Sequence, residues 1–202
     1  HMRSIHNCMA FYDYSKAWIT HCSIQRQQGS QELECIPQWR EVYRKPIVID
    51  EMCYEGDIEQ YWGDISPEQM LQRMWKTAVY GGYPGHGECY DNENIWWSHG
   101  GKLYGESYKR FGFLLDVMKK FNGSMVPIAP LYARSKNGNV KIWYGAEHRP
   151  HYRMIDFGEE KWNVYVLDTW EMTMEEGGIF TGKCKIELPV KEGMAILAEK
   201  TK

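Results

Sequence analysis

The sequence lacks the features that mark several broad classes of protein. Its formal net charge of −3 leaves no basic surplus, which argues against nucleic acid and membrane surfaces as partners. No apolar run approaches the ~18 residues that a membrane-spanning helix needs. The chain does not open on the charged, apolar and small-residue succession of a signal peptide. Its 202 residues then allow one ordinary domain or two small ones.

Cysteine spacing gives no sign of a metal or redox site. No two cysteines form a C-x-x-C pair, and no cysteine–histidine group has the spacing of a zinc site. The six are Cys8, Cys22, Cys35, Cys53, Cys89 and Cys184. Four lie in or just past apolar strand-like runs, so we interpret them as small buried thiols in a reducing compartment. We therefore expect no metal and no other cofactor.

Residues 1–121 alternate short apolar runs with helical stretches. Four of these runs predict strands, at residues 3–7, 20–25, 46–50 and 83–90. Helices are expected between the second and third strands, between the third and fourth, and after Ser107. The middle helix has a clear start, because Ser66 and Gln69 form a capping box and Pro67 fits the first helical position. This alternation is typical of a parallel sheet with right-handed crossovers.

The pattern of apolar residues changes after Phe121. Residues 122–130 hold glycine, serine and two prolines without periodicity, and we expect a linker there. Residues 131–202 then show short alternating runs at near-regular spacing, and Asn137 with Gly138 predicts a hairpin turn between the first two. Such runs favour a small antiparallel β-sandwich. The predicted fold is therefore α/β followed by all-β, in two domains.

Polar residues collect around the predicted strands of the first half. Ligands of parallel α/β sheets bind beyond the carboxyl ends of the strands, and a carboxylate is costly to bury unless it is stabilised. The candidates are His6 and Asn7 on the first strand, His21 and Gln25 on the second, Asp50 and Glu51 on the third, His86 and Glu88 on the fourth, and Trp96 and Trp97 beyond it. We therefore predict a polar pocket at this edge.

Several candidates also have a purely structural interpretation. Asp50 can cap the next segment, Glu51 can be a solvated loop residue, and His21 can be a hydrogen-bonded core histidine. The tryptophan pair can pack against the last helix, although aromatic rings also stack on the C–H face of sugars. Two further acids are expected to be solvated loop charges, namely Glu55 and Asp57.

Several long motifs resemble one family. They are "KPIVIDEMCYEGDI" (45–58), "GGYPGHGECY" (81–90), "WWSHGGKLYGES" (96–107) and "KIELPVKEGMAI" (185–196). In this order they resemble the C-terminal part of bacterial clan A glycoside hydrolases, which have an apiosidase-like (β/α)8 TIM barrel followed by a β-sandwich. The resemblance implies that residues 1–121 form barrel strands five to eight and residues 131–202 the β-sandwich. We expect a cytoplasmic bacterial protein.

The resemblance also implies roles for the strand-end residues. Glu51 holds the place of the catalytic nucleophile, the carboxylate that attacks the anomeric carbon in a retaining glycosidase. The acid/base of the family belongs to barrel strand four, which this sequence does not contain. Glu88 is expected to bind sugar hydroxyls or to hold Glu51 rather than to replace that acid. The expected substrate-binding residues are His6, Asn7, His21, Gln25, Tyr54, His86, Glu88, Trp96 and Trp97.

Three classes of function stay open. The first is a fragment of a retaining glycosidase with a carbohydrate substrate, inactive without the missing half of its barrel. The second is a non-catalytic carbohydrate-binding or structural fragment. The third is a thiol enzyme that uses Cys53 or Cys89 with His86. Because an open half-barrel leaves sheet edges unpaired, we expect a partner there, either the missing half or a second copy of the chain.

Overall fold

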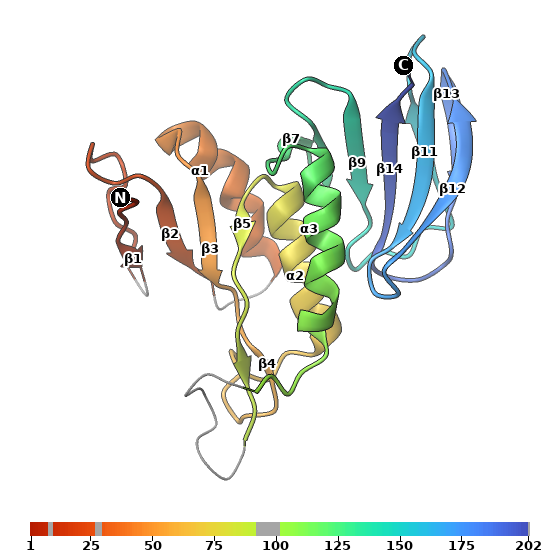
Figure 1. Cartoon of the computed structure of the whole chain (residues 1–202). Coiled ribbons are helices and arrows are strands. Elements are labelled where there is room, and N and C mark those ends of the chain that lie inside the picture. Colours follow the sequence, from red (N-terminus) through yellow and green to blue (C-terminus); the bar gives the residue numbers. More distant parts are fainter. Residues whose placement is uncertain (8–9, 27–29, 92–101, 202) are drawn as a thin grey trace. The chain divides into compact units, whose positions relative to one another are not determined.

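The chain divides into two compact units, each with its own sheets. The computed structural model describes residues 1–7, 10–26, 30–91 and 102–201, and the units are His1–Phe111 and Gly112–Lys202 (Figure 1). Among the described residues, no helix combines the length and the apolar character that crossing a bilayer requires. Mixed helices and sheets agree with the predicted combination of an α/β and an all-β part.

The first unit is built on a small parallel sheet. Its elements are β1 (His6–Asn7), β2 (Cys22–Gln25), the 3-10 helix η1 (Ser30–Cys35), α1 (Ile36–Tyr43), β3 (Ile47–Glu51), β4 (Glu55–Gly56), α2 (Pro67–Val79), β5 (Tyr83–Pro84), β6 (Glu88–Cys89) and the 3-10 helix η2 (Ser107–Arg110). Strands β1, β2, β3 and β5 pair in that order, and every pairing is parallel. The strand–helix alternation therefore predicted the sheet type correctly.

The expected strand at 83–90 is two short strands in different sheets. β5 pairs with β3, whereas β6 pairs with β4 in a separate parallel pair. The break follows from Pro84, which has no N–H to donate, and from Gly85, where a Cβ would come within 2.6 Å of the carbonyl oxygen of Asp50. Segment 85–89 thus runs close alongside the chain that follows β3.

Strands β2 and β3 form the buried centre of the sheet. Ile24, Ile47 and Ile49 are fully buried, as expected for parallel strands covered on both faces. The register is irregular between Ile24 and Gln25, and as a result Gln25 pairs with Glu51. The last residues of these strands therefore lie side by side at the carboxyl edge.

Helix α2 begins as the sequence predicts and fixes the loops beyond the sheet. The Ser66 hydroxyl accepts a hydrogen bond from the Gln69 backbone N–H, and the Gln69 side chain accepts one from the Ser66 N–H. Arg73, on the buried face, donates from Nε to the Met52 carbonyl at 2.5 Å and from Nη2 to the Arg26 carbonyl at 3.0 Å. The helix thereby braces the segments that follow β2 and β3.

The second unit contains a six-stranded antiparallel sheet and a two-stranded one. Its elements are α3 (Phe111–Lys120), which begins at the last residue of the first unit, β7 (Val126–Ala129), β8 (Tyr132–Arg134), β9 (Val140–Tyr144), β10 (Tyr152–Asp156), β11 (Trp162–Asp168), β12 (Thr173–Phe180), β13 (Lys183–Glu187) and β14 (Met194–Lys200). The large sheet has the order β12-β11-β14-β9-β8-β7, and β10 pairs with β13.

Both sheets of the second unit contribute to one apolar core, formed by Ile155, Phe157, Trp162, Val164, Ile186, Ile196 and Ala198. The Asn137–Gly138 turn joins β8 to β9 as predicted, with Gly138 at a φ of 76° that suits glycine. β7, from the stretch expected to be a linker, pairs with β8 and extends the sheet.

Candidate active site

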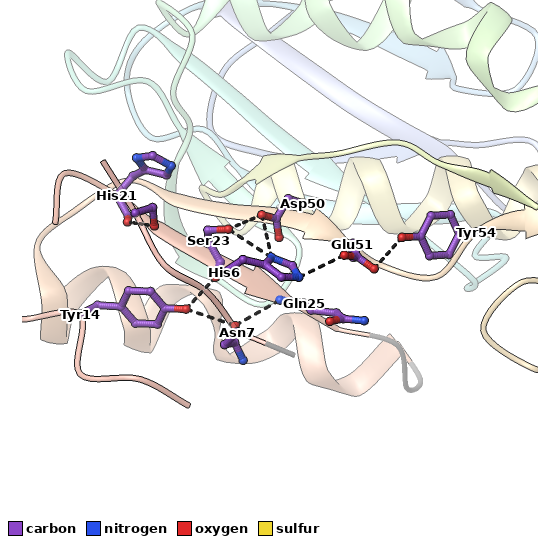
Figure 2. A network of polar contacts seen from close by, with 10 residues as sticks. His6, Asn7, Tyr14, His21, Ser23, Gln25, Asp50, Glu51 and Tyr54 are labelled. Atoms are coloured by element: carbon purple, nitrogen blue, oxygen red, sulfur yellow. Dashed lines mark hydrogen bonds and ion pairs between the residues drawn. The ribbon is translucent and has the colours of Figure 1, made fainter. Parts of the chain in front are cut away.

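Glu51, the last residue of β3, has a carboxylate that two side chains hold. His6 Nε2 lies 3.1 Å from Glu51 Oε1, and the Tyr54 hydroxyl donates to Oε2 at 2.5 Å (Figure 2). The Glu51 side chain is still 30% exposed. A carboxylate fixed at both oxygens and open to solvent at a parallel-sheet edge can meet a ligand without rearranging.

Asp50 and Ser23 extend this network behind Glu51. Asp50 Oδ2 accepts a hydrogen bond from the Ser23 hydroxyl and lies 3.1 Å from His6 Nδ1. The other carboxylate oxygen, Oδ1, is buried, and none of the residues that the structure describes hydrogen bonds to it. Strand pairing explains the cluster, because His6 on β1 lies opposite Ser23 on β2. Ser23 was not predicted, although its position opposite His6 could have indicated it.

Tyr54 connects Glu51 to the chain beyond β5. Its ring packs edge-on against Trp62, with centroids 5.7 Å apart, and a Cβ on Gly87 would overlap its ring carbons. Burial, together with the hydrogen bond and charge of Glu51, raises the pKa of the Tyr54 hydroxyl well above its ordinary value. Tyr54 therefore stays a donor to Glu51 over the whole physiological range. Gly87 is a second residue that the sequence did not single out.

Asn7 and Gln25 lie beside the network but are buried. Asn7 is 1% exposed and Gln25 6%. Asn7 Oδ1 accepts hydrogen bonds at 3.2 Å from the Tyr14 hydroxyl and from the Gln25 backbone N–H. Tyr14 also donates to the Ser23 carbonyl at 2.6 Å. These contacts support the strand ends, so the predicted role of Asn7 and Gln25 in binding a substrate stays a prediction.

The structure does not bring His21 to this edge. His21 precedes the first residue of β2, whereas Gln25 is the last, so His21 lies at the opposite edge of the parallel sheet (Figure 2). Its Nδ1 is 3.1 Å from the Thr20 hydroxyl. The sequence associates His21 with the correct strand. Its place just before that strand, however, is at the amino edge, away from Glu51. Trp96 and Trp97 lie outside the described residues.

A second polar cluster lies at β4 and β6. Glu55, expected to be a solvated loop charge, is instead fully buried. Its Oε1 accepts hydrogen bonds from the Tyr90 hydroxyl at 2.9 Å and the Glu106 N–H at 2.6 Å. Its Oε2 accepts from the Ser107 N–H at 3.0 Å and from the Ser107 hydroxyl. These four donors explain why a carboxylate is buried here, against the sequence-based expectation.

The predicted site residues His86 and Glu88 belong to this second cluster. Glu88 accepts hydrogen bonds from the backbone N–H groups of Tyr104 at 2.8 Å and Gly105 at 3.2 Å. His86 Nε2 lies 3.8 Å from Glu88 Oε1, and burial lowers the pKa of His86 despite the nearby charges of Glu88 and Glu55. Both carboxylates therefore anchor the backbone of residues 104–107.

Potential metal-ligating atoms of Glu55, His86 and Glu88 lie within 4.8 Å of one another. The hydrogen bonds to Glu55, however, occupy the lone pairs that a cation would need. Burial alone would raise the pKa of Glu55, but the hydrogen bonds from Ser107, Glu106 and Tyr90 outweigh it and lower the pKa. The backbone N–H groups thus already supply the stabilisation that a metal would give this anion.

The cysteines near the site are poor candidates for catalysis. Cys53 is 5% exposed and Cys89 is fully buried, and neither forms a disulfide. Burial, with a smaller contribution from the charge of Glu51, raises the pKa of the Cys89 thiol to about 11. A reactive thiol needs the opposite shift, so the structure disfavours the thiol-enzyme hypothesis.

Solved structures of glycoside hydrolases share this fold. A candidate glycoside hydrolase from Bacteroides vulgatus ATCC 8482 has a TM-score of 0.89 at 24% identity, over 100% of this chain and 45% of its own. A glycoside hydrolase family 5 protein from the same organism has a TM-score of 0.66 at 14% identity, over 91% and 52%. A GH27 β-L-arabinopyranosidase from Geobacillus stearothermophilus has a TM-score of 0.53 at 12% identity, over 100% and 51%.

The chain therefore has a glycoside-hydrolase-like fold and spans about half the length of these three structures. Residues 130–198, within the second unit, match a protein family described as a domain of unknown function, DUF5605. No curated protein matches the chain.

Proposed function

We propose that the chain carries the nucleophile of a retaining glycoside hydrolase of the apiosidase-like, clan A type, and that Glu51 is this nucleophile. The observation that supports the proposal is the partly exposed Glu51 carboxylate at the carboxyl end of β3, held by His6 and Tyr54. In the reaction, a Glu51 oxygen forms a bond to the anomeric carbon while the bond from that carbon to the leaving oxygen breaks. Water then hydrolyses the glycosyl ester and frees Glu51.

A complete site needs a second carboxylic acid about 5–5.5 Å from the nucleophile, to protonate the leaving oxygen. Of the acids in the described part of the chain, Glu55 and Glu88 are hydrogen bonded to the backbone of residues 104–107. We therefore propose that the acid/base comes from further barrel strands placed beside β1, on a longer polypeptide or a partner chain. A second copy of the chain is the alternative partner.

A mechanism-based label tests the role of Glu51 without requiring the acid. Fluorinated glycosyl fluorides have a leaving group that needs no protonation, so the nucleophile alone can form the glycosyl ester. We expect mass spectrometry to find the label on the peptide that contains Glu51. The full chain is tested alone and mixed with a polypeptide that supplies the remaining strands.

The control for this labelling is Glu59→Gln, which changes an exposed acid eight positions along the chain. It should label like the parent, whereas Glu51→Gln should not label. A label on another residue, or equal labelling of Glu51→Gln, would refute the assignment.

A non-catalytic carbohydrate-binding role is the second candidate function. It is favoured by the engagement of Glu55 and Glu88 in backbone hydrogen bonds, which leaves Glu51 without an evident acid partner among the described residues. Calorimetry of the full chain against plant-wall oligosaccharides separates the two functions. Binding without labelling of Glu51 supports the second, and labelling supports the first.

A further inference from the structure

We infer that Asp50 is a positioning residue that acts on Glu51 through His6, whose ring bridges the two carboxylates as a doubly protonated imidazolium. This inference deepens the proposed function, on which its catalytic meaning rests. It concerns three residues at one edge of the sheet, with Asp50 and Glu51 on β3 and His6 on β1, and the His6 ring lies between the two carboxylates (Figure 2).

The geometry of the ring carries the argument. His6 Nδ1 lies 3.1 Å from Asp50 Oδ2, and Nε2 lies 3.1 Å from Glu51 Oε1. A neutral imidazole has one N–H and one nitrogen lone pair, so one of these contacts would set a lone pair against a carboxylate oxygen. Only the imidazolium donates at both contacts. The Asp50 contact is then a hydrogen bond between opposite charges, which is of the stronger, charge-assisted kind, and the Glu51 contact is an ion pair.

The two carboxylate oxygens of Asp50 have different surroundings. Its Oδ2 already accepts a hydrogen bond from the Ser23 hydroxyl, while Oδ1 is buried without a partner in the described chain. The side chain as a whole is 35% exposed, and the His6 ring is its ion-pair partner at Oδ2. Asp50 in turn holds the ring, so that Nε2 is directed at Glu51.

Few other groups face the His6 ring. The Ser23 oxygen lies 3.3 Å from Nδ1 and can share that hydrogen. Tyr54 touches Glu51 on its other oxygen and keeps its own proton. Among the described residues, the charged groups that form ion pairs with the ring are thus the two acids of β3. The chain of alternating charges, Asp50 then His6 then Glu51, follows from these contacts.

The proposed reaction gives this arrangement a role. In the glycosyl ester Glu51 is neutral, and hydrolysis of the ester returns the negative charge to its oxygen. A cation 3.1 Å from that oxygen stabilises the returning charge. Asp50 keeps the cation in position while Glu51 is esterified and can no longer do so.

NMR of the full chain labelled with ¹⁵N-histidine tests the inference without a substrate. At pH 6 we expect two ring N–H signals from His6, one from each ring nitrogen. In Asp50→Asn we expect the Nδ1–H signal to exchange faster with water or to be lost, because the carboxylate that accepts from Nδ1 is gone. Asp64→Asn, at an exposed acid of the same unit, should leave both signals unchanged.

Two outcomes overturn the inference. One is a wild-type ring that shows a single N–H signal instead of two, which is decisive even where Asp50→Asn does not fold. The other is an Nδ1–H signal that exchanges with water equally fast in wild type and in folded Asp50→Asn. Neither depends on glycoside hydrolysis, so failure of the Glu51 labelling experiment would be recognised separately.

Discussion

At the scale of the residue, Tyr54 offers the simplest test of how Glu51 is held. Tyr54→Phe removes only the hydroxyl that donates to Glu51 Oε2 at 2.5 Å. A hydrogen bond to a charged group contributes about 1.5–3 kcal/mol, so we expect kcat of the assembled enzyme to fall about 10- to 100-fold. Steady-state kinetics on an aryl glycoside measures it. An unchanged kcat would show that the hydroxyl does not matter for the reaction.

Gly87 should matter through Tyr54 rather than by itself. An alanine Cβ at this position would overlap the ring carbons of Tyr54 and displace the ring from Glu51. We therefore expect Gly87→Ala to lose about as much activity as Tyr54→Phe, again about 10- to 100-fold. Gly112→Ala is the matched control, because its Cβ would meet nothing within 4 Å. Full activity in Gly87→Ala would contradict the packing argument.

Glu55 should contribute to stability in a pH-dependent way. Its pKa is lowered in the folded protein, so its contribution is complete above the unfolded value near 4.5 and is lost as the pH falls through the lower folded value. We expect Glu55→Gln to lower the free energy of unfolding by about 1–3 kcal/mol at pH 7.

Urea unfolding between pH 3 and pH 7 measures this contribution of Glu55. The gap between wild type and Glu55→Gln should narrow below pH 4.5, and Glu59→Gln should follow wild type throughout. A gap that is constant with pH would mean that the carboxylate is not the stabilising form.

Individual residues were predictable where the order of parallel strands decides their position, because the carboxyl ends of such strands lie at one edge of the sheet. Glu51 and His6 follow β3 and β1 to the carboxyl edge of the sheet, and the structure joins them. Glu55 could not be placed from the sequence, because its burial depends on donors 51 and 52 positions away. His21 was expected at the carboxyl edge although it is near the amino end of both the predicted strand 20–25 and β2, so the error was in its assigned edge and not in the strand boundary.

At the scale of the element, the start of α2 is the clearest local signal in the chain. Ser66→Ala removes the side-chain oxygen that accepts from the Gln69 N–H. The loss of such a cap costs about 1 kcal/mol, and chemical unfolding followed by circular dichroism should show a lower midpoint. Ser124→Ala, a serine outside any helix start, serves as the control. Equal midpoints for Ser66→Ala and wild type would mean that the cap is redundant.

Elements with strong periodicity were predictable, and very short ones were not. The strands β8 to β14 coincide closely with the alternating runs of the sequence. The alternation of apolar and polar residues is enough to indicate each of these strands. β4 and β6 have two residues each and exist only because segment 85–89 lies beside the chain after β3. No local pattern could have indicated that pairing.

At the scale of the whole molecule, the second unit should fold without the first. It has its own core, with residues from β10, β11, β13 and β14 among the buried set. We expect residues 112–202, expressed alone, to give dispersed amide NMR signals and a cooperative unfolding transition. A collapsed spectrum without cooperative unfolding would show that the two units depend on each other.

The buried Glu55 also affects how a pH–rate profile of the assembled enzyme should be interpreted. Activity lost on acidification has two sources, namely protonation of the attacking carboxylate and release of the segment at 104–107 from Glu55. The two differ in speed, since protonation of the partly exposed Glu51 carboxylate is immediate, whereas a buried segment is released more slowly. An acidic limb that deepens with time of incubation would thus report loosening of the scaffold, and an instantaneous one would report the chemistry.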